Sequence, residues 1–226
     1  MNDALSRRDV LRTVGGAGLA AAFGARALEY LGEDAEAATI STCLLTPEAT
    51  EGPYWVDGAL TRRNVTEGKP GLPVVIRFTV LNARTCKPIK SADVEIWHCD
   101  SLGNYSAVNG AATRFLRGNQ RSNAMGKAEF LTIFPGWYRG RTPHVHMKVS
   151  VGGNEVHSGQ VFFNEKITTA VYKQAPYRSR GSYDTPHASD NIYSQAGGSR
   201  AELKLARRTG GLRGYVGTIA IGVLTS

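Results

Sequence analysis

The chain has 226 residues, of which 42% are hydrophobic and 20% charged, and it contains 26 Gly, 9 Pro and only 3 Cys. This composition is typical of one globular domain and excludes a fibre or a disulfide-stapled scaffold, and no uncharged apolar run approaches the roughly 18 residues that span a membrane. The formal net charge is +8, but the basic residues are scattered among acidic and apolar neighbours, so nucleic-acid binding is not indicated.

The N-terminal residues have the features of an export signal. Arg7 and Arg8 precede residues 13–25, an apolar stretch without Asp, Glu, Lys or Arg, and residues 35–37 (AEA) supply the small-x-small pattern of a cleavage site. An adjacent Arg pair at this place resembles the twin-arginine signal, whose route carries proteins that are already folded. The pattern predicts a leader over residues 1–37 rather than a short amphipathic helix.

Residues 38–226 are expected to form a single exported domain. Export places the domain in an oxidising environment, where Cys43, Cys86 and Cys99 are expected to include one disulfide and one free thiol. The sequence does not decide which two of them pair.

A hydrophobic period of two predicts several β-strands. Apolar residues alternate along residues 72–81, and the same period returns in residues 92–98. Because residues 82–90 have the composition of a turn, these two strands are a candidate hairpin with a long loop. Further strands are predicted for residues 126–134, 143–151, 155–163 and 214–224.

Helical patterns are few. Residues 165–173 follow Asn164, a good helix cap, and residues 201–208 follow Ser199 in the same way. The many strands and the two short helices predict an antiparallel sandwich or barrel.

Two long irregular stretches, residues 46–71 and 177–198, interrupt this pattern. Structureless connections above about 12 to 15 residues are usually functional or disordered. Both stretches contain aromatic side chains, which favours packing over a site or an interface; flexible surface loops are the alternative. The aromatic residues include Tyr54, Trp55, Tyr177, Tyr183 and Tyr193.

The candidate chemical site centres on His144 and His146. Positions two apart on a strand project from the same face, so both imidazoles can reach one metal ion. An H-x-H pair alone is a weak signal, because core or surface histidines share this spacing. Two turns strengthen it, because one presents Tyr138 just before the pair and the other presents Tyr105 after a predicted strand.

Two tyrosines and two histidines together indicate a particular ion. Phenolate is a hard anionic donor suited to a hard, highly charged cation, and two phenolates with one hydroxide neutralise Fe(III). The sequence therefore favours Fe(III) over Zn(II). A thiolate site is not supported, because the three Cys are widely spaced and form no C-x-x-C pair.

Five strings together carry a specific family pattern over about 120 residues. They are TPEATEGPYW (46–55), VEIWHCDSLGNYS (94–106), FLRGNQ (115–120), FPGWYRGRTPHVHMKV (134–149) and SGQVFF (158–163). In this order they resemble the intradiol ring-cleavage dioxygenases, the family of protocatechuate 3,4-dioxygenase and catechol 1,2-dioxygenase. The resemblance implies a mainly β fold, an antiparallel β-sandwich of the Greek-key, prealbumin-like type with long loops and one or two short helices.

The resemblance also implies a mononuclear non-haem Fe(III) cofactor and assigns its protein ligands. The ligands it implies are Tyr105, Tyr138, His144 and His146. Tyr138 would be the phenolate that the substrate displaces during catalysis.

Three further residues receive roles by the same resemblance. Arg141 matches the catalytic Arg that steadies negative charge on the bound substrate, Gln160 lies near the iron, and Tyr54 borders the substrate pocket. Two departures separate the chain from the cytoplasmic enzymes: the spacing from Tyr138 to Arg141 is shorter, and no helical N-terminal domain is evident. The chain looks closest to the exported, single-domain members.

The implied reaction is cleavage of a catechol-type diol by O2 between its two hydroxyl-bearing carbons, giving a cis,cis-muconate-type product. The alternative is an exported sandwich module that binds aromatic polymer or polysaccharide, with a structural or vestigial iron site. Trp55, Trp137 and Tyr193 would serve such a surface. The expected partners are a small catechol and O2, with no nucleic acid and no membrane span, while the particular catechol and a homo-oligomeric state are left open.

Overall fold

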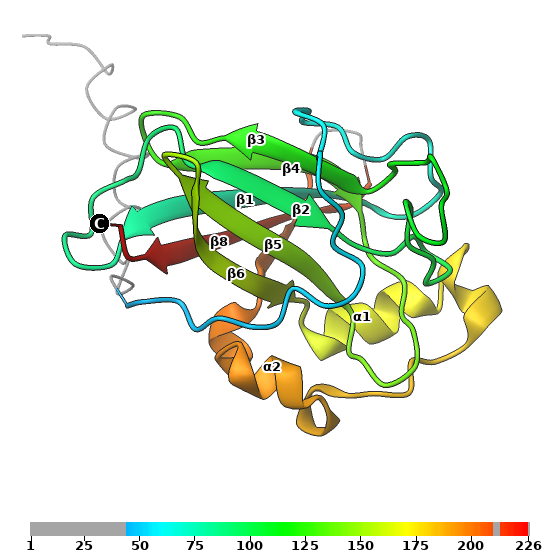
Figure 1. The fold of residues 1–226 in the computed structure, drawn as a ribbon. Coiled ribbons are helices and arrows are strands. Elements are labelled where there is room, and N and C mark those ends of the chain that lie inside the picture. The colour runs from blue at the N-terminus through cyan, green and yellow to red at the C-terminus, as the bar shows by residue number, and fades with distance from the viewer. Residues whose placement is uncertain (1–43, 210–212, 226) are drawn as a thin grey trace, which may run out of the picture. The chain divides into compact units, whose positions relative to one another are not determined.

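Two four-stranded β-sheets packed against each other form the framework of the protein (Figure 1). The computed structural model describes residues 44–209 and 213–225, so the predicted leader at residues 1–37 lies outside the described residues. One sheet has the strand order β4-β1-β8-β7 and the other β3-β2-β5-β6, which confirms the predicted mainly β sandwich. The strands are β1 (Pro73–Asn82), β2 (Asp93–Trp97), β3 (Arg117–Arg121), β4 (Lys127–Ile133), β5 (His144–Val151), β6 (Asn154–Phe162), β7 (Lys204–Arg207) and β8 (Tyr215–Val223).

The core lies between the sheets and follows from the period of two. Ile76 and Phe78 of β1 are fully buried, while Arg77 between them is exposed. The facing sheet contributes Ile96 of β2 and Met147 of β5 to the same cluster. Each such side chain stabilises the fold by about 1.5–3 kcal/mol through removal of apolar surface from water.

The predicted hairpin between residues 72–81 and 92–98 is wrong, because β1 and β2 belong to different sheets. Both strands have one apolar face, and these faces meet in the same core from opposite sides. Alternation identifies a half-buried strand but does not identify its partner. The sandwich is also not wholly antiparallel, since β1 pairs with β8 in parallel. Such a pair needs a long crossover, which the chain between them supplies.

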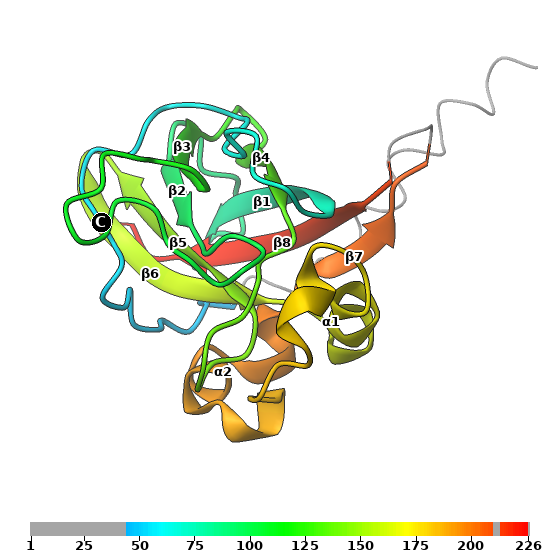
Figure 2. The same cartoon turned by 90° about the vertical axis from the view of Figure 1, so that its right-hand side faces the viewer.

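The predicted helix over residues 201–208 is also wrong. A short 3-10 turn ends at Ala201, and β7 then pairs with β8 in an antiparallel ladder. Leu205 packs against Gly217, so tertiary pairing overrides the local helical preference. Figure 2 shows β7 and the first part of β8 extending together from the sheet. Strand β3 was not predicted, because its sequence, RGNQR, has no apolar alternation.

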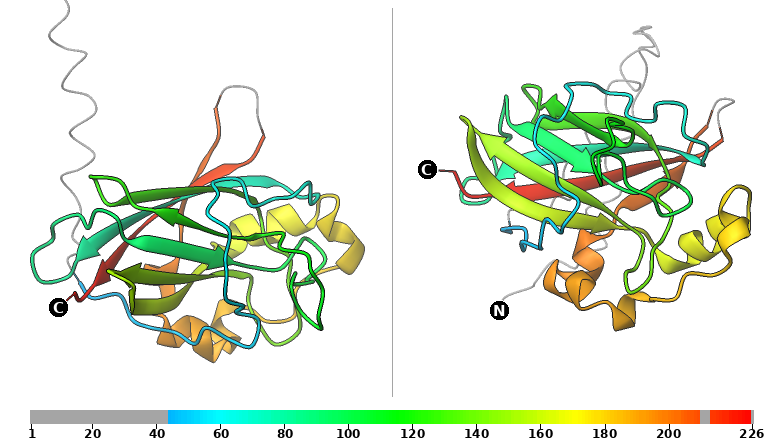
Figure 3. Two further views of the ribbon diagram at one scale, coloured as in Figure 1. Left: turned by 45° about the horizontal axis from the view of Figure 1, so that its top comes forward. Right: turned by 45° about the vertical axis from the view of Figure 1, so that its right-hand side comes forward.

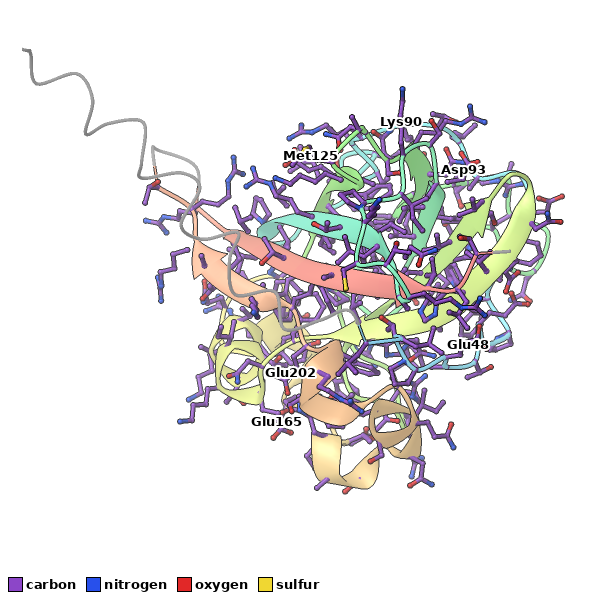
Figure 4. All side chains as sticks on the ribbon, turned by 90° about the vertical axis from the view of Figure 1, so that its left-hand side faces the viewer. Glu48, Lys90, Asp93, Met125, Glu165 and Glu202 are labelled. Atoms are coloured by element: carbon purple, nitrogen blue, oxygen red, sulfur yellow. The ribbon has the colours of Figure 1, made fainter. Side chains whose placement is uncertain are left out.

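The predicted helix after Asn164 is confirmed as α1 (Glu165–Tyr172), and the Asn164 side chain accepts a hydrogen bond from the Lys166 amide. The stretch 177–198, predicted as irregular, instead contains α2 (Asn191–Gln195) and short 3-10 turns. Both helices lie along one side of the strands (Figure 3). Figure 4 shows Glu165 and Glu202 beside these helical segments, and Lys90, Asp93 and Met125 at the opposite end.

The outer face of the β3-β2-β5-β6 sheet carries polar side chains. His144, His146 and Lys148 of β5 lie on this face, beside Glu95 and Trp97 of β2. The irregular chain after residue 46 crosses the face and covers them, as expected for a loop packed over a site. No helix among residues 44–209 and 213–225 is long and apolar enough to cross a membrane.

The described cysteines fit the expectation of one disulfide and one free thiol. Cys86 is disulfide-bonded, and Cys99 is a free thiol that is buried beside Trp97 and Tyr105. Cys43 lies outside the described residues.

Candidate metal centre

Strand β5 presents both histidines to the covered face of its sheet. His146 pairs across the ladder with Trp97 on one side and with Gln160 on the other. The Trp97 indole stacks on the His146 ring with centroids 5.0 Å apart and planes 6° apart. This packing fixes the plane of the imidazole, and the period of two along β5 places both rings on the same face of the sheet.

The nitrogen atoms of these rings and one phenol oxygen converge. His144 Nδ1 donates a hydrogen bond to the Thr142 carbonyl over 2.7 Å, which leaves Nε2 as the lone-pair nitrogen. His144 Nε2 lies 3.1 Å from His146 Nε2 and 3.0 Å from the Tyr138 hydroxyl oxygen. Three of the four predicted ligands are therefore in direct contact.

One arginine ties together the two loops that carry the tyrosines. The Arg180 guanidinium donates hydrogen bonds to the carbonyl oxygens of Leu102 and Trp137, and it lies over the Trp137 ring. Gly136 lets the two loops lie close together, because a Cβ at this position would overlap the Asp100 carbonyl oxygen. The 100–105 and 135–138 turns are thus held side by side.

Tyr105 is held from its C-terminal side. Arg117 of β3 donates to the hydroxyl oxygen of Ser106 at 3.0 Å and to the Ser106 carbonyl at 2.8 Å. The Tyr105 ring stacks on Tyr54 with centroids 4.3 Å apart and lies 5.8 Å from the Tyr138 ring. The structure therefore brings Tyr105, Tyr138 and Tyr54 together.

Burial favours the uncharged forms of the two histidines and the two tyrosines in the protein without a metal ion. Desolvation lowers the pKa of His144 to about 3 and the pKa of His146 well below its ordinary value. Desolvation also raises the pKa of Tyr138 to about 12 and that of Tyr105 well above its usual range. Only a strongly positive centre among them would draw the phenols into their anionic form.

These residues fit a metal ion of high charge. Neighbouring ligands on an ion with bonds of about 2.0–2.2 Å lie about 3 Å apart, which matches the two contacts of His144 Nε2. The Tyr105 hydroxyl is buried without a hydrogen-bond partner among the described residues. In the described part of the chain, no group of three His, Cys, Asp or Glu could hold a metal.

Arg141 and Gln160 meet at the edge of the site. Arg141 Nη2 donates to Gln160 Oε1, and Gln160 Nε2 donates to the Thr50 carbonyl at 2.8 Å. Arg141 Nε forms a 3.0 Å ion pair with Asp190 Oδ2, and the Asp190 side chain is only 1% exposed. Arg141 is therefore held between a buried carboxylate and an amide, with its charge near the predicted metal ligands Tyr138 and His144.

Sequence reasoning missed Asp190. Its Oδ2 also accepts from the Thr142 amide at 2.9 Å, and its Oδ1 caps α2 by accepting from the Ile192 and Tyr193 amides. Burial alone would raise the pKa of Asp190, but these amides and Arg141 hold it below its ordinary value. No predicted pattern pointed to Asp190, because it lies in the stretch 177–198 that was predicted as irregular.

The three aromatic residues proposed for a polymer-binding surface are half-buried and make contacts within the protein. Trp55 lies over the Lys148 ammonium, and Trp137 lies under the Arg180 guanidinium. Tyr193 stacks on His187 and donates to Glu202 at 2.7 Å. None of these packing arrangements favours the polymer-binding alternative.

Known proteins share sequence and fold with this chain. The family model described as Dioxygenase matches residues 50–171. The sequence is 38% identical over 185 residues to Catechol 1,2-dioxygenase 1 of Acinetobacter lwoffii, covering 70% of this chain and 57% of that protein. The match therefore spans little more than half of that relative's length.

Solved structures show the same fold. An intradiol ring-cleavage dioxygenase from Tetranychus urticae superposes with a TM-score of 0.77 at 31% identity, over 80% of this chain and 95% of that one. The dioxygenase domain of a dioxygenase carbohydrate-binding protein fusion from Streptomyces sp. SirexAA-E superposes with a TM-score of 0.62 at 26% identity. This match covers 80% of this chain and 99% of that one. With the family match over more than half of its residues, this chain belongs to the intradiol ring-cleavage dioxygenase family.

Proposed function

We propose that the protein cleaves a catechol-type aromatic diol by intradiol insertion of O2, giving a cis,cis-muconate-type dicarboxylate that contains both oxygen atoms. The observation that carries this proposal is the convergence at His144 Nε2, which lies 3.1 Å from His146 Nε2 and 3.0 Å from the Tyr138 oxygen. With Tyr105 they would hold a mononuclear non-haem Fe(III). When bound, the ferric ion supplies a Lewis acid that withdraws electron density from the catechol ring and makes it reactive toward O2.

Tyr138 has a proton-holding role in this scheme. With Fe(III) bound, Tyr138 would be a phenolate, and its oxygen would accept a proton from a catechol hydroxyl as the substrate enters. Burial raises the pKa of Tyr138 to about 12, so the residue retains that proton once it has it. Tyr105, more deeply buried and stacked on Tyr54, would stay in place as the second phenolate.

Arg141 supplies a fixed positive charge. The ion pair to Asp190 and the hydrogen bond to Gln160 orient its guanidinium before substrate arrives. A preorganised charge placed where negative charge develops on the substrate lowers the barrier without reorganisation during the reaction. Gln160 in turn links Arg141 to the Thr50 carbonyl, and Tyr54 covers the Tyr105 side of the site.

Oxygen consumption tests the proposal directly. The iron-loaded protein is mixed with catechol, hydroxyquinol and protocatechuate in turn, and O2 uptake and the ultraviolet spectrum of the product are recorded. We expect one O2 consumed per diol for at least one of the three, with a muconate-type product. Iron-loaded protein that consumes no O2 with any of them would overturn the proposal, and retention on an aromatic polymer in the same preparation would favour the binding-module alternative.

We also propose that the protein is exported by the twin-arginine route. The support is Arg7, Arg8 and the uncharged residues 13–25 that follow them. Expressed in a bacterium with this pathway, the wild type should appear outside the cytoplasm with an N-terminus after Ala37. Replacement of both arginines by Lys should retain the full-length chain inside, and unchanged export of that variant would contradict the proposal.

A further inference from the structure

The segment of residues 50–55 crosses the sheet directly over the candidate metal centre. The Thr50 carbonyl accepts the hydrogen bond from Gln160. Gly52 adopts the left-handed conformation with φ +72, and a Cβ there would lie 3.1 Å from Cε1 of His146. Tyr54 then stacks on Tyr105. Each of these contacts requires the segment to lie close against the sheet.

A single buried lysine anchors this segment. Lys148 is on β5, two residues beyond His146 on the same face, and it is 8% exposed. Its Nζ donates to Glu51 Oε2 at 2.7 Å and lies 3.9 Å from the centroid of the Trp55 ring. Glu51 and Trp55 flank Gly52 and Tyr54 in the sequence, so one ammonium group holds the segment on both sides of the part that covers the site.

Two further carboxylates complete the anchor. Glu155 of β6 forms a 3.0 Å ion pair with Lys148 from the sheet side. Glu95 of β2 accepts a 3.4 Å hydrogen bond from Trp55 Nε1. Lys148 therefore has one carboxylate partner on the segment and one on the sheet. An ammonium and an indole in contact attract each other by about 0.5–2 kcal/mol, more when water is excluded.

We propose that Lys148 is a positioning residue that, through Glu51 and Trp55, holds the 50–55 segment over the candidate metal centre and thereby sets which ring substituents the site accepts. The part about substituents rests on the proposed function. Its physical basis is that Tyr54 can act as a wall of the pocket only while the segment is fixed. If the segment is mobile, each binding event must order it, which costs conformational entropy and weakens binding. A mobile segment can also move aside for rings with larger substituents.

The two carboxylates on Lys148 provide a matched pair of variants. Glu51→Gln removes the partner on the segment, and Glu155→Gln removes the partner on the sheet. The two side chains are 42% and 48% exposed, so neither change threatens the core. Lys148→Met removes both links while keeping an apolar stem. The first readout is amide hydrogen exchange of the 50–55 segment, which needs no catalysis.

We expect Glu51→Gln to speed exchange in this segment about two- to fivefold, the range given by loss of a partly exposed ion pair, and Lys148→Met to speed it at least tenfold. Glu155→Gln should exchange like the wild type. In oxygen-uptake assays, Glu51→Gln should raise KM for catechol about two- to fivefold with kcat within a factor of two. It should also lower the preference for catechol over 4-methylcatechol, whereas Glu155→Gln should alter neither.

The outcomes separate the two proposals. If the amides of the 50–55 segment exchange at the same rate in Glu51→Gln and in Glu155→Gln, the anchoring role of Lys148 is overturned. Faster exchange with unchanged KM and unchanged preference would overturn the effect on substituents. If wild-type protein consumes no O2 while the exchange difference between the variants persists, the anchor stands and the proposed dioxygenase activity fails.

Discussion

Asp190 is the most informative residue to change, because one buried carboxylate joins the site to the fold. Its Oδ2 accepts from Arg141 Nε at 3.0 Å and from the Thr142 amide at 2.9 Å, while its Oδ1 caps α2. In Asp190→Asn, one oxygen becomes an NH2 group that faces N–H donors. The variant therefore loses either the cap of α2 or the ion-pair partner of Arg141, whose side chain is only 15% exposed.

The expected loss of stability follows from these contacts. Breaking a buried ion pair by removing one partner costs about 3–5 kcal/mol. The lower end applies here, because Arg141 keeps Gln160 as a partner and the amide oxygen of the substituted side chain still accepts a hydrogen bond. A loss of about 3 kcal/mol lowers Tm by about 6–12 °C for a domain of this size. The matched control is Asp184→Asn, an exposed carboxylate that accepts from the Gly140 amide; its cost should stay within about 0.5 kcal/mol.

The pH dependence gives a second measurement. The folded-state pKa of Asp190 lies below its unfolded value, so its stabilising contribution is present above about pH 4 and is lost as the pH falls through the folded-state pKa. Asn does not titrate. The difference in Tm between wild type and Asp190→Asn should therefore shrink when thermal unfolding is followed from pH 7 down to pH 3. A difference that stays constant over this range would refute the argument.

The same variant tests how Arg141 is positioned. Removing a preorganised charged donor costs on the order of 10²–10³ in turnover, and a displaced donor should cost less. We expect kcat/KM for the best catechol to fall roughly tenfold to a hundredfold in Asp190→Asn, with iron content unchanged by metal analysis. Wild-type kcat/KM in this variant would mean that the ion pair with Arg141 serves stability alone.

Three further predictions concern the site itself. Arg141→Ala should lose turnover on the order of 10²-fold or more while retaining iron, and loss of iron instead would assign Arg141 a structural role. The iron-loaded wild type should be burgundy from phenolate-to-iron charge transfer, and Tyr105→Phe should lose most of this colour and release about one proton fewer per iron bound in an unbuffered titration. A colourless wild type with stoichiometric iron would contradict the two-phenolate assignment. Gly136→Ala makes a Cβ overlap the Asp100 carbonyl oxygen, so it should lower Tm by several degrees and weaken the colour, while Gly140→Ala, where a Cβ meets nothing within 4 Å, should leave the colour intact.

Much of the site was predictable because its residues lie within short segments. His144 and His146 share a face by the period of a strand, and the Tyr138 turn is only six residues away from His144. Tyr105 was a candidate from its turn after a predicted strand, whereas Gln160 could be assigned only through the family resemblance. Their approach to the histidines depends on the pairing of β5 with β2 and β6, which no local pattern reveals.

The strand positions were similarly readable, but their partners were not. The alternation in residues 72–81 and 92–98 correctly marked β1 and β2, yet placed them in one hairpin. For residues 201–208, local preference indicated a helix, and pairing with β8 produced β7 instead. In both cases the deciding contacts join residues far apart along the chain.

The sequence by itself determined the mainly β class and the placing of His144 and His146 on one face of a strand, because these depend on residue type and on a period of two. Its preference for a ferric ion stays a prediction. The tertiary structure alone decided that Asp190 orients Arg141 and that Lys148 anchors the segment over the site. Asp190 is 49 residues from Arg141, and Lys148 is 97 residues from Glu51. Charges at such separations meet only when the sandwich has folded, since the pairing of its strands determines which side chains share a buried face.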